Sequence, residues 1–234
     1  MNGILRPTSG RILLDGEDLF SDPKKLVSYR FRVGLVFQYP EYQLFEETVY
    51  RDIAFGPKNM GKSQEEIQSL VRDAAHFTGV EESWMEKSPF ELSGGQKRRV
   101  AIAGVLAMDP EVIVLDEPAA GLDPSGREEI LGRICRYQKE RNKTVLLISH
   151  SMEDVARFAD ELVVLKDGRA ILHDTVDRVF HNAHLIESAG LALPQVTRLM
   201  RRLRERGLPV SPSIHTVSDA VLELTRLWKE GREC

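Results

Sequence analysis

Two adjacent carboxylates, Asp116 and Glu117, follow directly on the apolar run 112–115 and precede Pro118. A buried strand of this composition ends at the carboxyl edge of a parallel sheet, where α/β proteins bind ligands. One acid there can hold Mg²⁺, mostly through water, while the next polarises a water for attack on a phosphoryl group. The pair therefore indicates phosphoryl-transfer chemistry. The competing interpretation is a strand that simply ends in a polar loop.

A second candidate is a helix start that is rich in glycine. Ser93-Gly94-Gly95-Gln96 follows Leu92 and leads into a stretch with helical apolar spacing. Ser93 can cap this helix, and the two glycines leave its first backbone amides unobstructed for a phosphate group. Ser-Gly-Gly is also common in ordinary loops. The motif gains weight because the acidic strand begins a few residues after its helix.

Two single polar residues also end apolar runs: Gln38 follows residues 33–37, and His150 follows residues 144–149. Each could be an ordinary polar residue at a strand end, and a lone histidine usually is one. Their place in the order of the chain changes that assessment.

Five segments, taken in chain order, resemble the motifs of the ATP-binding cassette (ABC) ATPases. They are Gln38, residues 92–96, residues 116–117, residues 119–123 and His150. The resemblance covers the chain to about residue 172 and implies that ATP and Mg²⁺ are the cofactors.

The resemblance also implies a role for each motif. Gln38 is similar to the Q-loop glutamine, which is expected both near Mg²⁺ and among the catalytic residues. Asp116 is similar to the Walker B aspartate, which is expected near Mg²⁺. Glu117 is similar to the catalytic carboxylate, and His150 to the switch histidine at the γ-phosphate. The expected nucleotide-binding residues are those of the signature motif and the D-loop aspartate: Ser93, Gly94, Gly95, Gln96 and Asp123.

Residues 37–45, 53–57 and 119–124 narrow the resemblance to the ATPases of energy-coupling factor (ECF) transporters, which import vitamins or metal ions. This resemblance implies a second ABC ATPase as partner, a sister chain or otherwise a second copy. It also implies integral membrane coupling and substrate-binding subunits, no nucleic acid, and a peripheral position on the cytoplasmic face of the membrane.

A cassette ATPase carries a phosphate-binding loop with a lysine before its Q-loop, whereas residues 1–10 resemble the segment that follows this loop. We therefore expect an N-terminally truncated sequence that binds nucleotide poorly at its own half-site and is nearly inactive alone. Residues 56–63 match G-x-x-x-x-G-K-[ST], but Pro57 removes an amide donor and Ser63 is better explained as a helix cap. We reject this match.

The elements that must position these residues follow from local patterns. Asp15-Gly16 predicts a tight hairpin, and the non-alternating runs 33–37, 112–115 and 144–148 predict parallel strands covered on both faces. Ser63 and Glu66 have capping-box spacing at a helix start. Residues 162–172 predict a hairpin at the edge of the sheet.

The local patterns predict an α/β fold. The resemblance implies that this is a P-loop NTPase-like ABC ATPase core with a mainly parallel sheet, an antiparallel β piece, a helical subdomain and a small C-terminal helical extension. The ATPase domain is expected over residues 1–173, with its helical subdomain at about 41–108, and the extension over 174–234. In the extension, residues 195–206 predict a helix stopped by Gly207, and a last helix begins near Thr216.

Composition excludes several other classes of protein. Of 234 residues, 42% are apolar and 29% charged, which suits a globular core. The net charge of −4 disfavours general nucleic-acid binding, and no apolar run nears the roughly 20 residues of a bilayer span. The start lacks a secretory pattern and two cysteines make no disulfide framework, so we expect a reduced, cytoplasmic protein. The basic clusters 97–99 and 200–206 are expected to be solvated faces.

Two alternatives stay open. A soluble ABC ATPase acting on nucleic acid or ribosomes usually has a long coiled coil between Q-loop and signature, or two cassettes, and neither is present here. A degenerate regulatory half-site subunit would fit the missing phosphate loop, but the retained Asp116, Glu117 and His150 argue against it.

Overall fold

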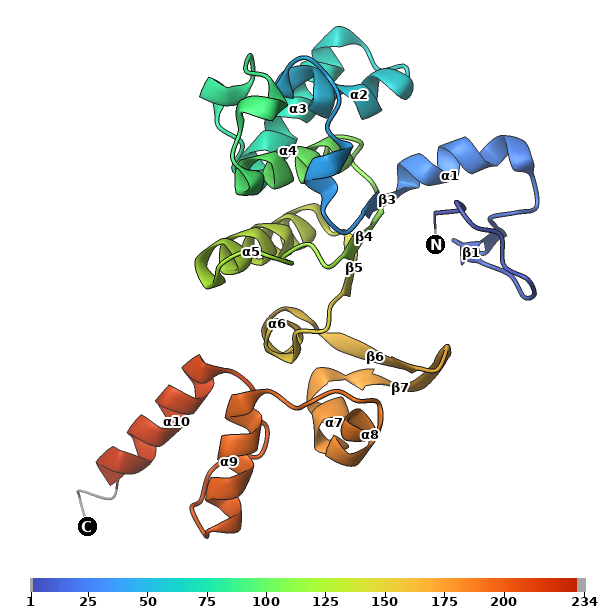
Figure 1. The fold of residues 1–234 in the computed structure, drawn as a ribbon. Coiled ribbons are helices and arrows are strands. Elements are labelled where there is room, and N and C mark those ends of the chain that lie inside the picture. The colour runs from blue at the N-terminus through green and yellow to red at the C-terminus, as the bar shows by residue number, and fades with distance from the viewer. Residues whose placement is uncertain (1, 231–234) are drawn as a thin grey trace. The chain divides into compact units, whose positions relative to one another are not determined.

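The computed structural model describes residues 2–230, which form two compact units divided between Ile148 and Ser149 (Figure 1). The first unit contains β1 (Leu13–Leu14), β2 (Glu17–Asp18), α1 (Leu26–Arg32), β3 (Val33–Val36), α2 (Val49–Asn59), α3 (Gln64–Thr78), α4 (Gly94–Leu106), β4 (Val112–Asp116), α5 (Pro124–Arg141) and β5 (Thr144–Ile148). The second contains α6 (Met152–Phe158), β6 (Glu161–Lys166), β7 (Arg169–Thr175), α7 (Val176–His181), α8 (Ala183–Ser188), α9 (Gln195–Glu205) and α10 (Val217–Glu230).

The central sheet is parallel, as predicted, in the order β3-β4-β5. Strands β3 and β4 are mostly buried. Coverage of both faces is wrong for β5, whose residues alternate in exposure, with Leu146 37% and Ile148 52% exposed. The apolar run hides this difference because apolar residues stand at exposed as well as half-buried positions of β5.

Two hairpins use the same turn chemistry. Asp15-Gly16 joins β1 to β2 with φ of 50° and 81°, and Asp167-Gly168 joins β6 to β7 with φ of 49° and 74°. Two successive positive φ values define the type I′ turn, which matches the twist of paired strands. Both hairpins are therefore confirmed.

The second hairpin is predicted at the edge of the central sheet. In the described residues β6 and β7 pair with each other, and because they belong to the second unit, their place at that edge stays a prediction. Their apolar residues join a cluster around Val179, Phe180 and Ile186 of α7 and α8. Because this core continues through residue 173, the compact units divide at residue 148 rather than at 173. The assignment of 1–173 and 174–234 as family domains stays a prediction.

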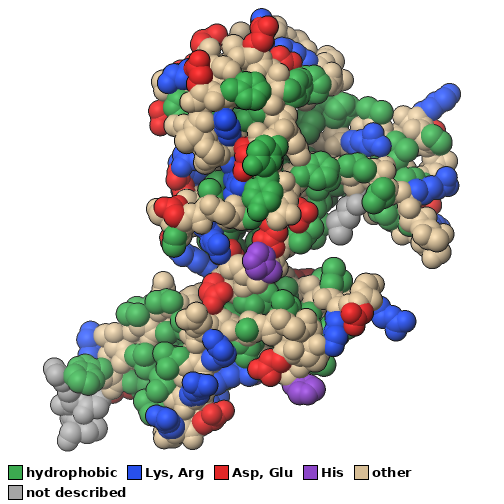
Figure 2. Space-filling model, in the orientation of Figure 1, with side chains coloured by type: hydrophobic (Ala, Val, Ile, Leu, Met, Phe, Trp, Pro, Cys, Tyr) green, Lys and Arg blue, Asp and Glu red, His purple; other side chains and the backbone are tan. Residues whose placement is uncertain are grey.

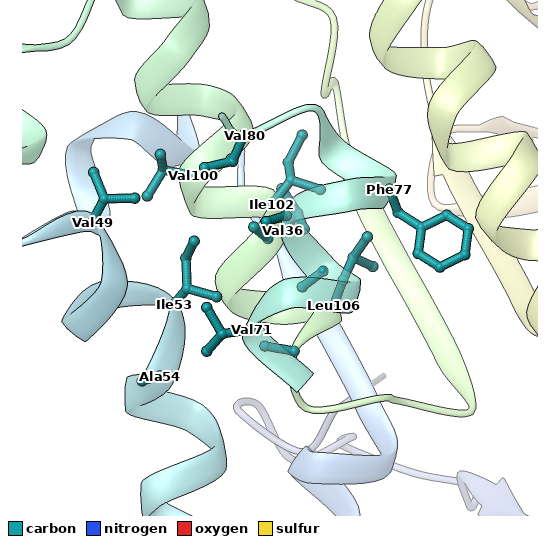
Figure 3. Close-up of a cluster of buried hydrophobic side chains, with 14 of the residues drawn as sticks. Val36, Val49, Ile53, Ala54, Val71, Phe77, Val80, Val100, Ile102 and Leu106 are labelled. Atoms are coloured by element: carbon teal, nitrogen blue, oxygen red, sulfur yellow. The ribbon is translucent and has the colours of Figure 1, made fainter. Parts of the chain in front are cut away.

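The segment from Glu41 to Met108 is mainly helical and surrounds α4. Figure 3 shows its core, in which Ile53 of α2, Val71 of α3 and Val100 of α4 are at most 1% exposed. The predicted capping box is confirmed, since Ser63 Oγ accepts from the Glu66 amide and the Glu66 carboxylate from the Ser63 amide. Thus α2 and α3 hold α4 on the side away from the sheet.

On its other side α4 lies very close to the sheet. A Cβ added at Gly34 of β3 would lie 2.6 Å from Val105 Cγ1 of α4 and 3.1 Å from Pro110 Cγ. Real Cβ atoms essentially never approach another atom so closely, so any side chain at position 34 would force Val105 to shift. The end of α4 is thereby fixed against β3.

The C-terminal helices match their predicted starts and stops. Helix α9 covers Gln195–Glu205, and Gly207 follows with a φ of 91°. Thr216 Oγ1 accepts from the Asp219 amide at the start of α10. None of the helices described in residues 2–230 has the length and apolar character needed to cross a bilayer.

Replacing Ile53 by Ala should lower the free energy of unfolding of the first unit by about 2–5 kcal/mol, because it leaves a cavity beside α4. Urea unfolding followed by Trp84 fluorescence, in a Trp228→Phe background, measures the change. Val27→Ala, at a side chain 57% exposed in the same unit, should change it by less than about 0.5 kcal/mol. Equal effects of the two substitutions would contradict the described core.

Candidate functional site

Parallel register brings three of the predicted site residues to one edge of the sheet. Val36 is paired with Leu115, and Asp116 with Ile148, so β3, β4 and β5 all end at this edge. Gln38 lies two residues beyond the end of β3, and Asp116 and Glu117 lie at the end of β4. Carboxyl ends of parallel strands are where such sheets bind ligands.

Asp116 and Glu117 are both half-buried. Glu117 has a φ of 46°, its amide donates to the Ile148 carbonyl at 3.0 Å, and its own carbonyl accepts from the Ala120 amide at 3.0 Å. A left-handed conformation costs about 1–3 kcal/mol in a non-glycine residue and persists only where neighbouring contacts enforce it. Here two backbone hydrogen bonds do so.

The loop after β3 has a similar feature. Gln38 is exposed, and the next residue, Tyr39, has a φ of 57°. The chain thus turns through a left-handed non-glycine residue after both β3 and β4. Such conformations cluster at functional sites.

Helix α4 begins as predicted, with Ser93 as its cap. Ser93 Oγ accepts from the Gln96 amide at 3.4 Å, and the Ser93 amide donates to Gln96 Oε1 at 2.9 Å. A Cβ added at Gly94 or Gly95 would meet nothing within 4 Å, so this helix start is open. The first amides of a 13-residue helix therefore offer donors to an anion.

The structure gives two predicted nucleotide-binding side chains a local role. Gln96 completes the capping box of α4. Asp123 caps α5, since its Oδ1 accepts from the Gly126 amide at 2.9 Å. His150 is exposed and lies in the second unit, two residues after β5. The roles assigned to these three residues stay predictions.

The rejected G-x-x-x-x-G-K-[ST] match is not a strand-to-helix loop. Residues 56–59 form the end of α2, Lys62 Nζ pairs with Glu66 Oε1 at 3.0 Å, and Ser63 caps α3. The rejection of this segment as a phosphate loop is confirmed. The expected absence of such a loop before Gln38 stays a prediction.

Sequence reasoning missed Arg98. Its side chain is only 4% exposed, so the interpretation of residues 97–99 as a solvated face is wrong for Arg98. A signal was present, because Arg98 lies four and eight positions before Ile102 and Leu106, both buried on α4. Helical spacing therefore places Arg98 on the apolar face.

Arg98 forms a forked ion pair with Glu41, with Nη2 to Oε1 at 2.8 Å and Nε to Oε2 at 3.1 Å. Burial alone would raise the pKa of Glu41. The hydrogen bonds that Glu41 accepts from Arg98 and from the backbone, together with the positive charge of Arg98, outweigh burial and hold this pKa below its usual value. Glu41 is therefore a carboxylate at neutral pH.

The end of β4 offers carboxylate oxygens, from Asp116 and Glu117, which are ligands that suit a hard cation such as Mg²⁺. No group of three or more His, Cys, Asp and Glu side chains gathers as a metal cage anywhere in residues 2–230. Mg²⁺ is usually held by one or two carboxylates together with waters and substrate phosphates, which is what a carboxylate at this sheet edge can offer.

Comparison with known proteins agrees with this geometry. The family model described as ABC transporter matches residues 1–120. The ECF transporter ATP-binding protein EcfA2 of Clostridium acetobutylicum is 53% identical over 233 residues, covering 99% of this chain and 82% of the relative. EcfA2 of Clostridium tetani is 54% identical over 229 residues, covering 97% and 80%.

Solved structures give the same result. CbiO1 of Clostridium perfringens, part of the ABC transporter complex CbiONQ, is 42% identical with a TM-score of 0.72, covering 86% of this chain and 79% of that one. The ABC cassette MJ0796, solved as a dimer bound to ADP and Pi, is 27% identical with a TM-score of 0.65, covering 75% and 77%. Sequence, fold and the motifs at the sheet edge all agree, and the chain belongs to the ABC transporter family of ATP-hydrolysing transport ATPases.

Proposed function

We propose that this chain is the ATP-hydrolysing subunit of an ECF-type importer for a vitamin or metal ion, acting at the cytoplasmic face of the membrane. The observation that carries the proposal is that the same unit has both an open, serine-capped start of α4 and two acids at the end of β4. The names of the relatives favour an importer over a nucleic-acid or ribosome ATPase.

The start of α4 supplies the anion-binding part of the proposal. In the family two cassettes face each other, so Ser93, Gly94 and Gly95 would bind the phosphates of a nucleotide held by a sister chain or a second copy. Backbone amides and the helix dipole give this start a partial positive charge. The Ser93 hydroxyl keeps its proton to donate, because its oxygen accepts from Gln96.

The end of β4 supplies the chemical step. Asp116, with Gln38, would hold Mg²⁺, which neutralises phosphate charge when bound. Glu117 would orient a water and draw off its proton as the water attacks the terminal phosphate, and His150 would donate a hydrogen bond to that phosphate. The fixed backbone of Glu117 suits this task, since a base must be held at hydrogen-bonding distance.

Exposed aromatic side chains from the end of β3 to the middle of α2 offer a place for the membrane subunits. Figure 2 shows hydrophobic side chains exposed on one face of the first unit. Five exposed aromatic residues fall within 37–55, with Phe45 and Phe55 edge to face at a centroid distance of 4.9 Å. These are Phe37, Tyr39, Tyr42, Phe45 and Phe55. Because Gln38 lies within this aromatic segment, a membrane subunit bound there would sense movement of the nucleotide site.

Ser93→Ala should lower ATP turnover by the chain purified with its partner ATPase about tenfold or more, because one phosphate donor is lost. Ser63→Ala is the matched control, since Ser63 caps α3 with the same capping box. Both substitutions should destabilise by about 0.5–2 kcal/mol. Loss of turnover in Ser63→Ala as well would instead support the rejected phosphate loop.

Glu117→Gln should reduce kcat by about 10²–10⁴-fold, because an amide cannot accept the proton of the attacking water. ATP binding, followed by equilibrium dialysis of the same complex, should be retained. Glu65→Gln at an exposed position of α3 should leave both quantities unchanged. A kcat within twofold of the parent in Glu117→Gln would exclude Glu117 as the base.

Phe45→Ala should weaken retention of the membrane subunits on the affinity-tagged chain, because it removes apolar area from the proposed contact surface. Co-purification from detergent-solubilised membranes, quantified by mass spectrometry, measures the loss. Val27→Ala has similar exposure, 57% against 58%, and lies outside the aromatic segment. Equal retention by the two variants would place the contact elsewhere.

A further inference from the structure

One buried side chain joins three of the motifs described above. Arg98, on the second turn of α4, pairs with Glu41 after β3 and donates from Nη1 to the Pro118 carbonyl at 3.3 Å and to the Ala120 carbonyl. These partners are 57, 20 and 22 residues away in sequence. The guanidinium carbon also lies 6.0 Å from the centroid of the Tyr39 ring.

The chemistry of these contacts requires an arginine. A guanidinium has five N–H donors in one plane, so it can donate to a carboxylate from one edge and to backbone carbonyls from the other. A lysine ammonium is a point charge on a flexible stem and cannot hold both directions at once. With the Glu41 side chain 14% exposed, losing Arg98 would leave a mostly buried carboxylate without its counter-ion, which is strongly unfavourable.

The partners of Arg98 lie directly beyond the two left-handed residues. Glu41 comes two residues after Tyr39, and Pro118 is the residue after Glu117. Arg98 itself is five residues from Ser93 at the start of the same helix. A single cation therefore fixes the distance between the phosphate-binding helix start and both loops at the sheet edge.

We propose that Arg98 is a positioning residue that couples the signature helix to the loops carrying Gln38 and Glu117, with Glu41 as its counter-ion. The inference rests on the proposed function, since its purpose is to hold Glu117 in register with Ser93. Arg98 touches neither reacting atoms nor the open helix start. It acts through the backbone of residues 39–41 and 118–120.

Hydrogen–deuterium exchange of the chain without nucleotide tests the coupling directly. Arg98→Met should raise exchange about tenfold in peptides covering both 38–44 and 117–123, because each loop loses a hydrogen bond to a buried charge. Arg99→Met is the matched control, since Arg99 lies on the same helix but bonds to Gly79 and Glu129. It should leave both loops unchanged. Faster exchange confined to α4, or to one loop, would overturn the proposal.

Two further substitutions keep the test valid if Arg98→Met misfolds. One keeps the positive charge at position 98, and the other removes the negative charge of Glu41. Arg98→Lys should give an intermediate increase in both loops, since it keeps the charge but not the fork. If Arg98→Met does not fold, Glu41→Gln applies the same test with the arginine in place, and an unchanged 38–44 peptide would then refute the coupling.

Kinetics of the complex with its partner ATPase provide a second readout. Arg98→Met should lower kcat at least tenfold while KM for ATP changes less than threefold, because Glu117 acts on the chemical step. A raised KM with kcat retained would contradict the positioning role. Hydrogen–deuterium exchange is measured without ATP. If Arg98→Met raises exchange in both loops but the parent protein has no ATPase activity, the proposed function is refuted and the coupling by Arg98 is not.

Discussion

The packing of α4 between the sheet and the helices α2 and α3 is the constraint on which the rest of the first unit depends. Its start is open, since a Cβ added at Gly94 or Gly95 would meet nothing within 4 Å, whereas its body fills the core, with Val100 and Ala103 fully buried. Two contacts hold it at opposite ends. Near its end, Gly34 lets β3 approach Val105, and near its start Arg98 is held by Glu41.

This double attachment has a consequence for the acids at the sheet edge. The loops after β3 and β4 each pass through a strained residue, Tyr39 and Glu117, and strain of this kind relaxes unless outside contacts oppose it. The contacts come from β5, through the Ile148 carbonyl, and from α4, through Arg98. The conformation of Glu117 is therefore a property of the assembled unit and not of its own loop.

The sequence predicted those features that depend on neighbours along the chain. The turns at Asp15-Gly16 and Asp167-Gly168 and the caps at Ser63 and Ser93 follow from residues at most three positions apart, and all four are present. The errors concern distant contacts. An apolar run such as β5 looks the same whether one face is covered or both, because the chain alone does not show which elements pack on it.

The capping roles of Gln96 and Asp123 are compatible with the nucleotide-binding roles predicted for them. A capping bond to the Ser93 amide engages only the oxygen of the Gln96 amide, so its NH₂ group can still donate to an anion. Similarly, Asp123 uses one carboxylate oxygen for the Gly126 amide and keeps a second acceptor oxygen. Each cap also fixes the rotamer of the side chain before any ligand arrives. Less conformational entropy is then lost on binding, which favours a site built from helix caps over one built from free side chains.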